Sequence, residues 1–248
     1  MSNLIRGEFY KLRKSRHFIG MIFLSLVATF FMMSHYEENI RVLDRFDPEL
    51  MSGMYSIKYS FRCILFTSFM FALFAGQFIA KDLKENISKS FIYGYKRSKV
   101  IASKLVVFIL FSLFIELIYT TILVYYGRAY WFEFNMENIL YLIRIIAIGV
   151  MYNVATISIV VMIAIITKSN LYTVVSPILF LLACSALSLN APILNIVSYV
   201  VCPFINGDGA ISRFAPLSDI ILGIVSSILT LVITIGVSLL YVKREDIK

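Results

Sequence analysis

Two ionisable side chains stand inside long apolar stretches, and these are the residues of the sequence best placed to bind a polar group. Glu116 lies in FSLFIELIYTT and Arg144 in YLIRIIAIG. A charge near the centre of a bilayer costs at least ~2.5 to 3.5 kcal/mol on insertion scales, so each should face protein or water and have a partner. We expect a Glu116–Arg144 pair between adjacent membrane spans, with Arg62 as the alternative partner. Such a pair either lines a substrate path or gate, or merely fixes the packing of two spans.

The other reactive side chains form no pattern typical of a catalytic or metal site. His17 and His35 flank the first apolar segment on opposite sides. Cys63, Cys184 and Cys202 have no metal-like spacing and are interpreted as small buried hydrophobes. The sequence also lacks the GxxxxGK[ST] loop that cradles nucleotide phosphates. We therefore expect neither catalysis nor a metal site, and any nucleotide that drives this protein should bind to another chain.

The composition is that of a membrane protein. The 248 residues are 60% hydrophobic and 15% charged, whereas roughly a quarter of an ordinary soluble domain is charged. A helix needs about 20 apolar residues to cross a bilayer core of roughly 30 Å. The predicted spans are approximately 18–34, 60–80, 102–126, 139–167, 171–189 and 217–242. We expect an all-α integral membrane protein with six transmembrane helices, forming a single domain over residues 1–248.

The basic residues are distributed unevenly about these spans. Most of the 23 Lys and Arg residues fall in the N-terminal arm, between the second and third spans, after the fourth span and at the C-terminus. An even number of spans places all four segments on one side, which the positive-inside rule identifies as the cytoplasm. The net charge of +8 therefore reflects sidedness rather than nucleic-acid binding. We expect a multi-pass protein of the cytoplasmic membrane with both termini cytoplasmic.

The N-terminal segment LIRGEFYKLRKSRHF has the pattern of an amphipathic helix. At 100° per residue, Ile5, Phe9 and Leu12 share one face, while Arg13 and the other basic residues occupy the rest. Such a helix would lie on the inner membrane surface before the first span. The alternative is a simple basic anchor that sets the topology of the chain.

The connection between the second and third spans mixes bulky and basic residues, in the segment ISKSFIYGYKRSK. A solvated loop has little use for four large apolar or aromatic side chains in so few residues, so this surface calls for a partner. Physical reasoning alone leaves lipid headgroups and a protein groove equally open.

Between the fifth and sixth spans, the apolar run 191–205 is too short to cross a bilayer, and Pro192, Pro203 and Pro216 interrupt helices there. A short re-entrant or interfacial element on the outer side fits this segment best. A plain apolar outer loop is the alternative.

Three motifs together resemble the permease subunits of ABC-2-type transporters. GEFYKLRKSRHF is similar to that family's E-(F/Y)-x-K-x-x-(K/R)-(S/R) opening. The inner segment KSFIYGYKRSKVIASKLV resembles its connection, which has a Gly, an Arg and then (S/A)-K. The ending YVKREDIK resembles its (F/Y)-x-(K/R)-(K/R)-D-(I/L). The motifs occur in order over a frame of six predicted spans.

The resemblance implies a role for the inner connection. In that family it forms a cytoplasmic coupling helix between spans 2 and 3, which docks in a cleft of a separate ATP-binding subunit. The docking residues carried over to this sequence are Ser88, Phe91, Tyr93, Gly94, Tyr95 and Arg97. The amphipathic helix of Ile5 to His17 would flank this contact. ATP and Mg²⁺ would bind to the partner, leaving no cofactor in this chain.

The resemblance also implies an assembly and a function. Two ATP-binding subunits would drive this permease and a second one, identical or related, to export an amphipathic peptide, antibiotic or lipid-like molecule. Compact six-span members of the family often give bacteria resistance to antimicrobial peptides. The alternative is a non-transporting membrane immunity or sensor protein that binds its ligand.

Overall fold

The computed structural model describes residues 2–43, 53–85, 97–127, 135–190 and 202–245, and within them the chain is helical almost throughout, with no strand. The longer helices are α2 (Arg16–Leu43), α7 (Arg97–Tyr126), α8 (Met136–Thr167), α9 (Asn170–Asn190) and α12 (Leu217–Glu245). The shorter ones are α1 (Ser2–Lys14), α3 (Gly53–Arg62), α4 (Ile64–Ala75), the π-helix η2 (Gly76–Ala80), α5 (Lys81–Glu85) and α11 (Pro203–Ala210). The all-α prediction is confirmed over this part of the chain.

Within the described residues, five helical stretches are long and apolar enough to cross a membrane: Arg16–Glu38, Ile64–Lys84, Ser98–Tyr126, Met136–Thr167 and Leu217–Arg244. They match five of the six predicted spans, and the second of them joins α4, η2 and α5. The remaining predicted span, 171–189, falls on α9, where the shorter apolar stretch is Asn170–Cys184. The chain is therefore a multi-pass membrane protein, and the sixth crossing stays a prediction.

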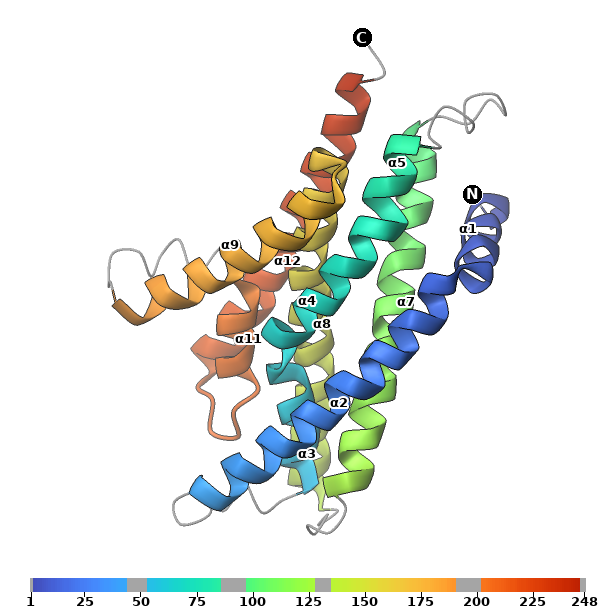
Figure 1. The fold of residues 1–248 in the computed structure, drawn as a ribbon. Helices are drawn as coiled ribbons and strands as arrows, with labels where there is room; N and C mark the ends of the chain where they lie inside the picture. Colours follow the sequence, from blue (N-terminus) through green and yellow to red (C-terminus); the bar gives the residue numbers. More distant parts are fainter. Residues whose placement is uncertain (1, 44–52, 86–96, 128–134, 191–201, 246–248) are drawn as a thin grey trace.

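The helices run alternately up and down, and both termini lie at one end of the bundle (Figure 1). This end of the bundle also contains the end of α5, the start of α7 and the turn from α8 to α9 (Figure 1). At that turn Lys168 adopts the left-handed conformation, with φ of 48°, and its N–H donates to the carbonyl of Ala164. We call this end of the bundle the terminal end.

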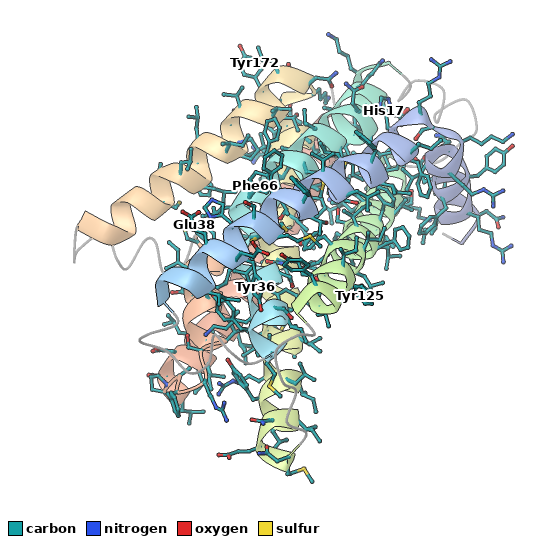
Figure 2. All side chains as sticks on the ribbon, turned by 60° about the horizontal axis from the view of Figure 1, so that its bottom comes forward. His17, Tyr36, Glu38, Phe66, Tyr125 and Tyr172 are labelled. Atoms are coloured by element: carbon teal, nitrogen blue, oxygen red, sulfur yellow. The ribbon has the colours of Figure 1, made fainter. Side chains whose placement is uncertain are left out.

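The surface of the bundle is apolar, as lipid contact requires. Phe30 on α2 is 71% exposed and Leu240 on α12 is 63% exposed, and large side chains project outward along several helices (Figure 2). Inside, Phe74 packs against Phe108 and Phe111 with ring centroids 4.8 Å apart in each case. Since exposed apolar area on this scale is unfavourable in water, the outer faces of these helices fit a hydrocarbon environment.

The short helix α11 is packed between α8 and α12. Pro203 occupies its first turn, where the missing N–H costs no hydrogen bond. Gly207 faces Tyr152 of α8 so closely that an added Cβ would lie 2.1 Å from the ring atom Cδ1. On the other side, Gly223 of α12 lies against Ala210. Only the last three residues of the predicted re-entrant run 191–205 fall in α11, and residues 191–201 lie outside the described part, so the re-entrant element stays a prediction.

Candidate functional site

Four charged side chains from three helices meet near the terminal end of the bundle, and we call them the Lys104 cluster: Glu8, Lys11, Asp82 and Lys104. Lys104 Nζ of α7 donates to Glu8 Oε2 of α1 at 2.8 Å and also forms an ion pair with Asp82 of α5. Glu8 Oε1 accepts from Lys11 Nζ at 3.0 Å. Two carboxylates thus balance two ammonium groups, as a buried charge network requires.

The central ion pair of this cluster, between Lys104 and Glu8, is buried. Lys104 is 3% exposed and Glu8 is 4% exposed. The Phe78 ring lies 5.1 Å from Lys104 Nζ, in the position of a cation–π contact. Removing one partner from a buried ion pair leaves an uncompensated charge, which is far more costly than losing a surface pair. The cluster therefore fixes α1 against the ends of α5 and α7.

The charges within α1 act on one another as well. Burial lowers the pKa of Lys11, but the hydrogen bond and the negative charge of Glu8, with a contribution from Asp82, raise it by more. The net effect is a pKa above the ordinary value of 10.5, so Lys11 stays protonated at physiological pH.

The amphipathic pattern of α1 is reproduced in part. Leu12 is 2% exposed, Ile5 packs against the core and Arg13 is exposed, so this apolar face meets the protein, whereas contact with the inner membrane surface was predicted. Phe9 is 39% exposed and borders a hollow of about 680 Å³ between α1, α2 and α7. The helix ends at Lys14, and His17 belongs to α2. The burial of Glu8 was not predicted, since its i, i+3 spacing from Lys11 indicates only a side-chain pair.

The predicted docking residues Ser88, Phe91, Tyr93, Gly94 and Tyr95 lie outside the described residues. Arg97 begins α7, and its side chain is also outside them. The helices on either side are described: α5 ends and α7 begins at the terminal end (Figure 1). The Lys104 cluster thus ties α1 to both helices that carry the predicted docking segment.

The predicted Glu116–Arg144 pair is not formed, and this expectation is wrong for the structure. Glu116 Oε1 accepts from the side-chain amide of Asn153 on α8. Arg144 Nη2 instead donates to the carbonyls of Ser212 and Arg213, at 2.5 and 3.0 Å. These carbonyls lie just after α11, which ends at Ala210, and the Ser212 carbonyl also accepts from the N–H of Ala215. The sequence could not place α11 beside α8, so this nearer acceptor was missed.

Arg62, the alternative partner, is engaged elsewhere too. Its Nε lies 2.7 Å from Asp208 Oδ1 on α11. This ion pair joins the end of α3 to the short helix between α8 and α12. From the sequence, Asp208 was an outer-loop charge, and nothing in its spacing linked it to Arg62.

In the comparison with protein families, the family model described as ABC-2 family transporter protein matches residues 4–185. The chain belongs to this family. The matched region contains all but the first two residues of α1, the Lys104 cluster, both flanks of the predicted docking segment and Glu116. Comparisons with curated proteins and with solved structures find no match.

The Lys104 cluster of this ABC-2 permease joins charged residues from two of its motifs. Glu8 and Lys11 are the acidic and basic residues of the opening motif, and Lys104 closes the inner motif. The two motifs lie far apart in the sequence, and their charged residues bind one another in the permease. The permease is a transmembrane component of an ABC transporter.

Proposed function

We propose that this ABC-2 permease exports an amphipathic peptide, antibiotic or lipid-like molecule across the bacterial cytoplasmic membrane. A pair of separate ATP-binding subunits, with bound ATP and Mg²⁺, supplies the energy, and a second permease, identical or related, completes the path. Residues 88–97 dock on the ATP-binding subunit from the cytoplasm. The family membership supports the transporter class. The apolar surface and the small number of charged residues inside the bundle suit a hydrophobic substrate.

The observation that carries this proposal is the Lys104 cluster. A partner that pushes on the segment between α5 and α7 acts on two helices that Lys104 and Asp82 hold together. Glu8 extends the same unit to α1. A partner can drive a conformational change only if its contacts with the permease differ between the two states. Ion pairs that join the ends of three helices make these helices move together rather than slide past one another.

Docking is tested by co-purification from detergent with the ATP-binding protein encoded nearest to this permease. We expect wild type to retain the partner and the double variant Phe91→Asp, Tyr95→Asp to lose it, because two charges would enter an aromatic contact. Phe214→Asp is the matched control, since Phe214 is 90% exposed after α11, beyond the proposed contact. Partner retention by the double variant would place the docking contact elsewhere, and no binding by wild type would contradict the assembly.

Export is tested in vesicles that contain the permease and its ATP-binding partner, with ATP added on the partner's side. We expect a fluorescent amphipathic peptide to accumulate inside only when ATP is hydrolysed. Binding of the peptide without accumulation would favour the alternative, a sensor or immunity protein, over an exporter.

A further inference from the structure

A groove of about 420 Å³ lies between α3, α7 and α8. Phe61 forms part of its wall, packed against Gly149, where an added Cβ would lie 2.6 Å from the ring. Leu117 and Thr120 of α7 and Ile146 of α8 complete most of the apolar lining. This volume falls at the small end of the range for ligand pockets, roughly 300 to 1,000 Å³.

One carboxylate lines this otherwise apolar groove. Glu116 is 4% exposed, and while its Oε1 accepts from Asn153, its Oε2 has no hydrogen-bond partner. The Asn153 Oδ1 atom is likewise unpartnered. The Tyr119 hydroxyl lies beside Glu116 and near Thr67. The site thus holds two buried oxygens, Glu116 Oε2 and Asn153 Oδ1, that have no hydrogen-bond partner among the described residues.

The groove opens toward the lipid-facing surface. Leu117 at its edge is 64% exposed and Ile146 is 44% exposed. Glu116 lies ten residues before the end of α7 at Tyr126, or about 15 Å along the helix at 1.5 Å per residue. The site therefore lies deep in the apolar layer, and a ligand that reaches it from the bilayer must be largely apolar itself.

We infer that this groove binds the ammonium end of an amphipathic amine, with the ammonium group against Glu116 and the chain along the apolar wall. A buried carboxylate without a counter-ion is costly in a membrane, and an ammonium group supplies both the charge and three N–H donors. The volume holds such a head and part of an alkyl chain rather than a folded peptide. This inference rests on the proposed function and adds that the exported amphiphile has a positively charged end.

The test uses the permease alone, in nanodiscs of phosphatidylcholine and phosphatidylglycerol, whose headgroups carry no N–H donor. The probe is a dodecylammonium analogue with a photoreactive diazirine next to the head, and labelled residues are located by mass spectrometry. We expect labelling on the walls of the groove, with excess dodecylammonium competing and dodecanol not competing. Because no ATP-binding partner is present, failure here would leave the export proposal standing.

The decisive variant is Glu116→Gln, which keeps the size of the side chain and removes its charge. We expect its labelling to fall at least ~10-fold, the effect of about 1.4 kcal/mol of binding free energy. Glu137→Gln, at an exposed position in the first turn of α8, is the matched control. If Glu116→Gln does not fold, Leu117→Trp gives a second route, because it fills the groove from its exposed edge and should block labelling.

Three results would overturn the inference: equal labelling of Glu116→Gln and wild type, equal competition by dodecanol, or no labelling of the groove in wild type. In the last case, a disulfide between two Leu117→Cys copies would identify a second permease as the occupant. Competition by added phosphatidylethanolamine would support the inference and assign the amine to a membrane lipid. Lack of competition by that lipid, with dodecylammonium still competing, would support a non-lipid amine.

Discussion

Replacing Lys104 with Met is expected to destabilise the permease by about 3 to 5 kcal/mol, the range for removing one partner of a buried ion pair. Glu8 and Asp82 would remain close together without the cation between them. The measurement is thermal unfolding of the purified protein in a neutral detergent. Stimulation of the partner's ATP hydrolysis by transported substrate should fall as well, because α1 would no longer be fixed to α5 and α7.

The matched control is Lys99→Met, since Lys99 is an exposed lysine on the same helix, five residues earlier. It should change the unfolding temperature little. A triple variant that combines Lys104→Met with Glu8→Gln and Asp82→Asn should regain most of the lost stability, because no buried charge is left unpaired. Equal unfolding temperatures for Lys104→Met and Lys99→Met would show that the cluster contributes little.

Replacing Gly207 with Ala is expected to lower stability by about 1 to 3 kcal/mol, as overpacking of a filled core does. The added Cβ would meet Tyr152 Cδ1 at 2.1 Å, so α11 must move away from α8. That movement would also disturb the Asp208 to Arg62 pair. Thermal unfolding measures the first effect, and the rate of vesicle transport measures the second.

The control for this variant lies on the same short helix. Gly209 has no atom within 4 Å of the position of an added Cβ, so Gly209→Ala should be neutral or stabilising by up to about 1 kcal/mol through helix propensity. Adding Tyr152→Ala to Gly207→Ala should relieve part of the clash, because it removes the ring and keeps the Cβ at 2.7 Å, so the double variant should cost less than the sum of the single effects. Equal effects of the two glycine variants would mean that α11 is not closely packed against α8.

The helical architecture was predictable because it depends on local composition. Runs of apolar residues in bilayer-length windows indicated the five helices that the structure bears out, including Leu217–Arg244. The amphipathic spacing of Ile5 and Leu12 predicted the apolar face of α1, but not that this face packs against the protein rather than the membrane surface. Such signals are periodic, so the sequence carries them without any knowledge of the tertiary fold.

The partners of the internal charges were not predictable, because they depend on how distant helices are placed. Glu116 and Arg144 were singled out as needing partners, yet Glu116 accepts from Asn153 through one oxygen only, and Arg144 donates to the carbonyls of Ser212 and Arg213. Depth along a helix restricts which residues can meet across a membrane but leaves the rotation of each helix open. Lys104 was counted among the basic residues that indicate the cytoplasmic side of the membrane. Its burial could not be predicted, because it depends on α1 packing against α7.

The π-helix η2 has a consequence for the rotational phase of the second span. A π turn contains about one residue more than an α turn, and successive residues of an α-helix are about 100° apart around its axis. Relative to an uninterrupted helix, the residues after Ala80 are therefore rotated by about a quarter of a circle, and in this phase Asp82 meets Lys104. The π-helix Gly76–Ala80 thus sets the rotation of the following residues about the helix axis. Inserting or deleting one residue there would turn the end of this span toward a different neighbour.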